Sequence, residues 1–147
     1  MTIISGPDVK KGTVDDIGSQ TDIFKTFLSL ANIKSKFSSI DSFDLSETIR
    51  KGKPSKRKFI PYFVGSELRA FRYKDHKIHF ITQGAYNMPP PRELHKKPLL
   101  YDLSKDIGES QDISEIDTKT LEIIIKESEL FKKDLIIRKS IVDVQFQ

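Results

Sequence analysis

The sequence predicts an α+β fold, and two observations lead to that prediction. Four short runs of β-type residues follow one another between residues 59 and 103, while apolar residues recur at helical spacing before and after them. Strands grouped between helical zones favour α+β over an alternating order of strands and helices. The 147 residues include ten Phe and four Tyr, which is enough bulky apolar material for the core of one domain.

The first predicted helix covers residues 22–31. Thr21 is a candidate cap at its start, Asp22 suits the positive end of the helix dipole, and Asn32 is a candidate left-handed stop. Apolar residues three to four positions apart form one side of this helix: Ile23, Phe24, Phe27, Leu28 and Ala31. This side is broad for so short an element, so we expect it to dock on another surface.

Residues 32–58 are predicted to form a loop with one helical turn near 46–50. The loop ends in six cations within nine residues: Arg50, Lys51, Lys53, Lys56, Arg57 and Lys58. A nucleic-acid interface would need such charges on an ordered face together with stacking aromatics. Gly52, Pro54 and Ser55 interrupt the run and no aromatic residue lies within it. We therefore favour a solvated loop and expect no nucleic-acid partner.

Four strands are predicted next, at Phe59–Val64, Leu68–Tyr73, Lys77–Thr82 and Leu99–Leu103. Gly65-Ser66 and Lys74-Asp75-His76 are short enough to be hairpin turns. The three prolines at positions 89–91 cannot stand in a central strand. Residues 84–97 are therefore predicted to form a long loop.

From Asp117 onward the apolar residues again recur at helical spacing, and Asp117 is the expected cap. The predicted apolar side of this C-terminal helix consists of Leu121, Ile124, Ile125, Phe131 and Leu135. Residues 136–147 end in an alternating pattern, which leaves an edge strand and a tail as open alternatives.

The composition excludes several kinds of site and partner. The chain has no cysteine, which rules out disulfides, thiolate zinc sites and cysteine nucleophiles. No apolar run reaches the length of a membrane span, so we expect no membrane partner. Residues 1–6 lack the basic and apolar regions of a signal peptide. We expect either a protein that is not exported or a natural N-terminus further upstream, so the localisation is unknown.

The histidines suggest neither a metal site nor a catalytic Ser-His-Asp arrangement. His76 and His79 are three positions apart, which on a strand places them on opposite faces, so they cannot share a metal ion. We expect His79 to lie in the sheet with one ring nitrogen hydrogen-bonded. His95 stands beside Lys96 in the predicted loop, and we expect it to be exposed.

Four segments carry a resemblance to a known family. They are the helix of residues 21–31, the hexapeptide Asp41-Ser42-Phe43-Asp44-Leu45-Ser46, the strand pair at 69–84, and Pro98–Glu109 with its Leu99-Leu100-Tyr101-Asp102-Leu103 core. Taken in this order over about residues 10–135, the chain resembles the C-terminal part of sulfatases of the arylsulfatase A and N-acetylgalactosamine-6-sulfatase type. Two positions depart from the family pattern, because Ser42 replaces a glycine and Ile107 replaces a proline.

The resemblance implies a parent enzyme with two domains. Such sulfatases have a large α/β domain that holds calcium and a formylglycine, followed by a small domain in which a helix packs on a four-stranded antiparallel sheet. Residues 1–35 would be the tail end of the large domain, and residues 36–147 would be the small domain. Calcium and formylglycine would then lie outside this chain. Complete family members are commonly lysosomal, secreted or periplasmic.

Two N-terminal motifs are similar to the family's active site without matching it. Ser5-Gly6-Pro7-Asp8-Val9 has valine where the formylglycine motif needs arginine. Asp15-Asp16 follows polar residues, whereas the family's calcium-binding pair follows an apolar strand. We therefore expect no catalytic residue and no metal ligand in this chain.

The resemblance leaves two roles open. In the first, the chain is a non-catalytic C-terminal portion of a sulfuric ester hydrolase that packs on the catalytic domain and shapes the substrate entrance. The alternative is a free-standing interaction module that assembles in trans with a sulfatase core. The candidate rim residues are Gln83, Gly84, Tyr86 and Asn87. The predicted interface with the large domain, which could also cause self-association, consists of Ile23, Phe24, Phe27 and Leu28.

Overall fold

A computed structural model describes residues 2–34 and 41–136. In chain order the elements are α1 (Asp22–Leu30), α2 (Ser46–Lys51), β1 (Phe59–Val64), β2 (Glu67–Tyr73), β3 (His76–Thr82), the short 3-10 helix η1 (Ala85–Asn87), β4 (Glu93–Asp102) and α3 (Thr118–Asp134). They form two compact units, Met1–Ile60 and Pro61–Gln147. The predicted boundary after residue 35 concerns the domains of a longer protein and stays a prediction. No helix in the described part of the chain is long and apolar enough to cross a membrane.

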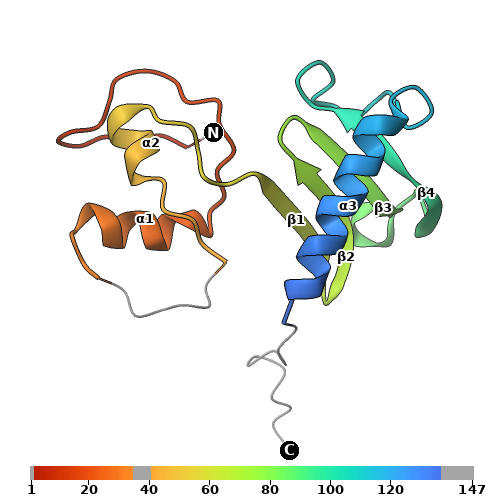
Figure 1. Cartoon of the computed structure of the whole chain (residues 1–147). Coiled ribbons are helices and arrows are strands. Elements are labelled where there is room, and N and C mark those ends of the chain that lie inside the picture. The colour runs from red at the N-terminus through yellow and green to blue at the C-terminus, as the bar shows by residue number, and fades with distance from the viewer. Residues whose placement is uncertain (1, 35–40, 137–147) are drawn as a thin grey trace, which may run out of the picture. The chain divides into compact units, whose positions relative to one another are not determined.

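The second unit is a four-stranded sheet in the order β1-β2-β3-β4 with α3 across one face (Figure 1). Phe71, Ile78 and Leu100 lie side by side on three neighbouring strands and are completely buried. Each such side chain contributes about 1.5–3 kcal/mol to folding. The ring of Phe131 from α3 lies 5.8 Å from that of Phe71. The predicted antiparallel sheet with a packed C-terminal helix is therefore confirmed.

The other face of the sheet carries polar side chains, because successive residues of a strand point to opposite faces. His79 pairs with Ala70 and Leu99, one position along from the buried row. Lys77 pairs with Arg72 and with Tyr101, and it lies on this same face. His79 is the residue of this polar face that also lines the candidate site.

The strand β4 is longer than the sequence predicted. It begins at Glu93 and pairs there with Thr82, so residues 93–97 are not part of a loop. Pro98 lies within the strand, which is possible because β4 is the last strand in the order of the sheet and pairs with β3 on one side only. The prolines at 89–91 end the loop before β4 and do not prevent pairing after it.

The C-terminal helix follows the prediction closely. The side chain of Asp117 accepts a hydrogen bond from the backbone N–H of Thr120, as expected of the cap. Leu121, Ile124 and Ser128 are buried. The buried hydroxyl of Ser128 is satisfied because it donates a hydrogen bond to the carbonyl of Ile125. The question of a strand or a tail at 137–147 lies outside the described residues.

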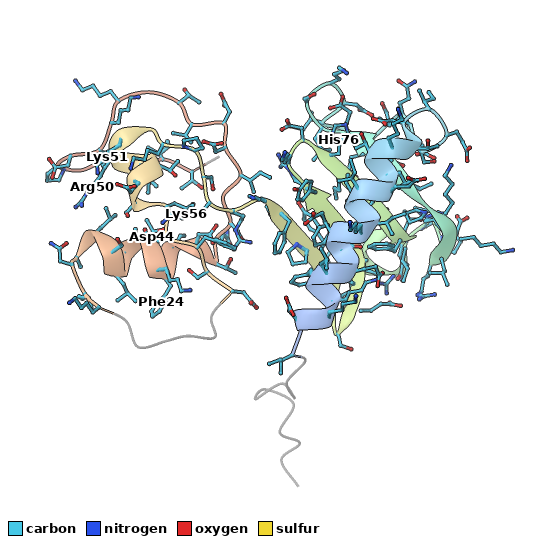
Figure 2. All side chains as sticks on the ribbon, viewed as in Figure 1. Phe24, Asp44, Arg50, Lys51, Lys56 and His76 are labelled. Atoms are coloured by element: carbon cyan, nitrogen blue, oxygen red, sulfur yellow. The ribbon has the colours of Figure 1, made fainter. Side chains whose placement is uncertain are left out.

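In the first unit, α1 buries its polar side. Asp22 and Thr26 are almost fully buried, whereas Ile23 is 45% exposed and Phe27 is 58% exposed. Phe24 is 46% exposed and lies on the side of α1 turned away from α2 (Figure 2). Within its own unit the helix thus has the opposite orientation to an ordinary amphipathic surface helix.

The reason for this orientation is a buried ion pair between Asp22 and Arg57. Two nitrogens of the guanidinium donate to the carboxylate at 2.6 and 2.7 Å. The same group also donates to the carbonyl oxygens of Asp41 and Phe59 and lies 4.7 Å from the ring centre of Phe43. Burial alone would raise the pKa of Asp22, but these hydrogen bonds and two from backbone N–H groups outweigh burial and lower it.

The ends of the two short helices are formed by left-handed residues. Asn32, just after α1, has φ of 56°, as predicted, and Gly52 closes α2 with φ of 66°. The expectation that Thr21 caps α1 is wrong, since Thr21 makes no capping hydrogen bond. Its hydroxyl accepts instead from Arg57.

Candidate ligand-binding site

A cavity of about 470 Å³ opens on the second unit. Strand β3 and the loop that follows it supply most of its lining, and β1 and β2 supply one residue each. The lining residues are Val64, Arg69, His79, Ile81, Thr82, Gln83, Gly84, Ala85 and Tyr86. A cavity of this size, with apolar walls and a few polar groups, suits a small organic ligand.

The loop at the mouth of the cavity is held by a close backbone approach at Gly84. Its N–H donates to the carbonyl of Pro90 at 2.8 Å, and a Cβ at this position would lie 2.0 Å from the carbonyl oxygen of Met88. Only glycine fits there without a shift of the backbone. Tyr86 follows with φ of 53° and is 97% exposed, so its ring is available to a ligand.

Arg69 is the cationic residue of the cavity. One of its terminal nitrogens donates to the side-chain oxygen of Gln83 at 3.2 Å, and its Nε lies 2.8 Å from a carboxylate oxygen of Glu67. The other oxygen of Glu67 accepts from Arg92 at 2.7 Å. Two cations therefore share one carboxylate, and this group of three side chains carries a net positive charge.

His79, which also lines the cavity, belongs to a second polar cluster. Its Nε2 lies 2.6 Å from one carboxylate oxygen of Glu109, and Lys77 donates to the other oxygen at 2.6 Å. The ring of Tyr101 meets the imidazole edge-on at 5.6 Å. This arrangement confirms the expectation that His79 lies in the sheet with one ring nitrogen bonded.

The charges in this cluster keep His79 neutral and Glu109 ionised near neutral pH. Burial and the nearby charge of Lys77 lower the pKa of His79 below its ordinary value, against the opposing effect of Glu109. Burial alone would raise the pKa of Glu109, but Lys77 and His79 outweigh it and the pKa is lowered. Both pKa shifts therefore favour a neutral imidazole beside an ionised carboxylate near neutral pH.

Three of the four predicted rim residues line the cavity, namely Gln83, Gly84 and Tyr86. Asn87 belongs to η1, the same turn. Their contact with a substrate stays a prediction. Arg69 and His79 were not predicted as members of the site. The sequence did carry a signal for them, because Arg69 and His79 are polar residues at internal positions of β2 and β3.

The N-terminal motifs do not provide the groups of a sulfatase active site. Asp15 and Asp16 are exposed, and no group of three or more Asp, Glu or His side chains in residues 2–34 and 41–136 is placed to hold a metal ion. These residues therefore do not fit a calcium site. Val9 occupies the position where the formylglycine motif needs an arginine.

The cationic run at 50–58 does not form one exposed surface. Arg57 is buried on Asp22, while Lys51 and Lys53 both bind Glu47, at 2.7 and 2.6 Å. Figure 2 shows Lys51 on the helix α2 and Lys56 on the segment that follows. Nearby carboxylates thus offset part of the charge.

Comparison with known proteins agrees with this architecture. A family model described as the C-terminal region of aryl-sulfatase matches residues 55–145, which is more than half of the chain. The chain belongs to this family. Human arylsulfatase A is 29% identical over 120 residues, which covers 71% of this chain and 24% of that protein. Bovine arylsulfatase A is 28% identical over 143 residues, which covers 84% of this chain and 28% of that protein.

Solved sulfatases share the fold. The PsFucS1 sulfatase from Pseudoalteromonas sp. superposes with a TM-score of 0.64 at 20% identity, over 76% of this chain and 25% of that one. The aryl-sulfatase C-terminal region described here thus spans about a quarter of the length of its relatives.

Proposed function

We propose that this chain is the non-catalytic C-terminal portion of an arylsulfatase-like sulfuric ester hydrolase. It packs on the catalytic domain through α1 and shapes the substrate entrance with the cavity between β3 and η1. The observation that carries the proposal is the orientation of α1. The buried Asp22–Arg57 pair turns Ile23 and Phe27 outward, so these two apolar side chains have exposed surface that another protein surface could cover.

The exposed fractions of these side chains give the free energy that their burial would contribute to docking. Ile23 and Phe27 are each about half exposed, and complete burial of such a side chain is worth about 1.5–3 kcal/mol. Finishing the burial of both would therefore contribute about 2 kcal/mol to docking, or roughly thirtyfold in the dissociation constant. The rest of the binding energy would come from other contacts.

The proposal is tested first on the chain alone. We expect it to bind a hydrophobic dye or to self-associate through α1, and the double variant Ile23→Ala/Phe27→Ala to do so less. Ile123→Ala is the matched control, since Ile123 is 54% exposed on α3 in the other unit. A monodisperse wild-type chain without dye binding would count against an unfilled docking face.

The alternative function is a free-standing module that assembles in trans with a separate sulfatase core. It uses the same face, so the two functions are separated by capture from the source cell. Recovery of an identified sulfatase catalytic domain, lost in Ile23→Ala/Phe27→Ala and kept in Ile123→Ala, supports assembly in trans. Absence of any sulfatase core among the captured proteins favours the role of a covalently joined C-terminal portion.

A further inference from the structure

The N-terminal segment of the first unit lies against α2 and forms a second, smaller cavity there (Figure 1). The backbone N–H of Lys10 donates to the carbonyl of Ile49 in α2 at 3.1 Å. Further along, the carbonyl of Ile17 accepts from the hydroxyl of Ser55 at 2.7 Å. The loop of residues 11–16 is therefore attached at both of its ends, so it can form one wall of a binding site.

The cavity between this loop and α2 has a volume of about 180 Å³. A water molecule takes up about 30 Å³, so a ligand of about six non-hydrogen atoms would fill the space. The N-terminal segment contributes four charged side chains to the lining, and α2 contributes one hydroxyl. They belong to Lys10, Lys11, Asp15, Asp16 and Thr48.

Thr48 is a buried polar residue whose hydroxyl lacks a partner. Its exposure is 6%, and among the residues that the structure describes its hydroxyl makes no hydrogen bond. The oxygen is not one of the enclosed side-chain atoms that lack a hydrogen bond, so it opens on the cavity that Thr48 lines. A buried hydroxyl without a partner costs free energy, and a ligand in this cavity would supply the partner.

The charged side chains around the cavity have both signs and do not neutralise one another. In the described ranges 2–34 and 41–136, none of Lys10, Lys11, Asp15 and Asp16 forms an ion pair. An anionic group of a ligand would pair with the lysines, and a cationic group would pair with the aspartates. A ligand with a single charge would satisfy one of these pairs and repel the other. The lining therefore favours a ligand that carries both charges.

The ammonium group of Lys10 is placed at the end of α2 that borders the cavity. A Cβ on Gly52, the residue that closes α2, would lie 2.7 Å from Nζ of Lys10, so a larger residue there would displace the ammonium. The carbonyl end of a helix favours a positive charge. Gly52 and the end of α2 thus hold one cation at the cavity.

We infer that this cavity is a binding site for a small zwitterion, namely an α-amino acid with a short side chain. The carboxylate of the ligand pairs with Lys10 and Lys11, its ammonium pairs with Asp15 and Asp16, and the hydroxyl of Thr48 hydrogen-bonds to one of these charged groups. Alanine has the size that the volume of about 180 Å³ admits. The inference goes beyond the proposed function and does not depend on it.

The test uses the full 147-residue chain, labelled with ¹⁵N, and L-alanine as the probe. Amide chemical shifts are recorded at neutral pH as the probe is added. We expect saturable shifts at Gly12 and Gly52, which line the cavity, and none at Gly65, which lies in the other unit. The dissociation constant should be on the order of 1 mM, because ion pairs near the surface are screened by solvent.

Two related compounds separate the two charges of the probe. Propionate keeps the carboxylate of alanine without the ammonium, and ethylamine keeps the ammonium without the carboxylate. Each should bind about tenfold more weakly than L-alanine, which is the value of a hydrogen bond to a charged group.

Variants test the contribution of the protein. Thr48→Val keeps the shape of the side chain, and since the hydroxyl has no partner in the free chain, the amide spectrum without ligand should be like that of the wild type. Binding of L-alanine should be about three- to tenfold weaker, the value of one hydrogen bond. Lys11→Gln removes one charge of the lining and should weaken binding about tenfold. Lys58→Gln is the matched control, because Lys58 is an exposed lysine of the same unit that does not line the cavity.

The inference is overturned by any of three results: no saturable shift at Gly12 and Gly52 with L-alanine, equal affinity for L-alanine and propionate or ethylamine, or equal effects of Lys11→Gln and Lys58→Gln. Saturable binding that weakens in Lys11→Gln and in Thr48→Val, and is kept in Lys58→Gln, supports it. The docking of α1 is tested separately by Ile23→Ala/Phe27→Ala.

Discussion

The buried ion pair of the first unit gives the sharpest prediction about stability. In Arg57→Met the carboxylate of Asp22 stays buried at 1% exposure and loses both guanidinium hydrogen bonds. Removing one partner of a buried pair usually costs about 3–5 kcal/mol. Asp22 keeps two backbone donors, the N–H groups of Ser19 and Phe43, so we place the cost at the lower end, about 3 kcal/mol.

The assay must distinguish the two units, because α1 and β3 belong to different compact units of the chain. Hydrogen exchange followed by mass spectrometry measures the free energy of opening of α1 and of β3 in the same sample. We expect Arg57→Met to lower protection in α1 and to leave β3 as in the wild type. The double variant Asp22→Leu/Arg57→Met should be more stable than Arg57→Met, since it leaves no uncompensated charge.

The matched control is Lys51→Met, which breaks an ion pair of similar length at the surface. Lys51 lies 2.7 Å from Glu47, but both side chains are largely exposed, so solvent screens their attraction. We expect this variant to show nearly the same protection from hydrogen exchange in α1 as the wild type. If Lys51→Met and Arg57→Met had equal effects, or if Arg57→Met left α1 protected, the argument that the buried pair orients α1 would fail.

Three further predictions concern the second unit. Gly84→Ala should destabilise the loop by about 1–3 kcal/mol, because its Cβ would meet the carbonyl of Met88; faster hydrogen exchange after β3 is the measurement, and unchanged exchange would contradict it. Leu100→Ala should cost about 2–5 kcal/mol in urea unfolding, since Leu100 is completely buried, whereas equal stability would show that the core lies elsewhere. Because the pKa values of His79 and Glu109 are both lowered by folding, the unfolded chain binds more protons and stability should fall with falling pH. The loss of stability should begin below the ordinary histidine pKa of 6.5 and continue below the ordinary glutamate pKa of 4.5. His79→Phe should remove the loss that begins below 6.5, and Glu109→Gln should remove the loss below 4.5. A wild-type curve of stability against pH without these two losses would refute the charge assignment.

Local pattern was enough to predict most of the sheet and the C-terminal helix. The β-type runs and the cap at Asp117 are signals within a few residues of the elements that they specify. The early start of β4 differs from the prediction because the prolines at 89–91 prevent strand pairing at their own positions and not at Glu93 and beyond. A strand can contain a proline such as Pro98 when it lies at the edge of its sheet. Whether it lies at the edge depends on which other strands pair with it, and the local sequence does not show this.

The contact that holds the polar side of α1 could not be predicted for a similar reason. The stripe of apolar residues predicted a docking surface, but the partner of the polar side, Arg57, is 35 residues away from Asp22. In the sequence Arg57 stood among cations that favoured a solvated loop. A long-range buried pair leaves no periodic signal.

The candidate site was predicted in part. The loop with Gln83, Gly84 and Tyr86 was predicted through the family resemblance, and these residues do line one cavity. The roles of Arg69 and His79 depend on the strand register and on Glu109, which lies 30 residues from His79. Such a cluster becomes visible only when the fold brings a strand and a distant loop together.

The central claim, that α1 is the docking face for a sulfatase catalytic domain, is tested most directly by hydrogen exchange in a mixture. The chain is combined with a sulfatase catalytic domain from the same source that lacks its own C-terminal region. The account predicts new protection along α1, from Asp22 to Leu30, in the wild type, and its loss in Ile23→Ala/Phe27→Ala. Association without added protection in α1, or protection that survives in this double variant, would contradict it.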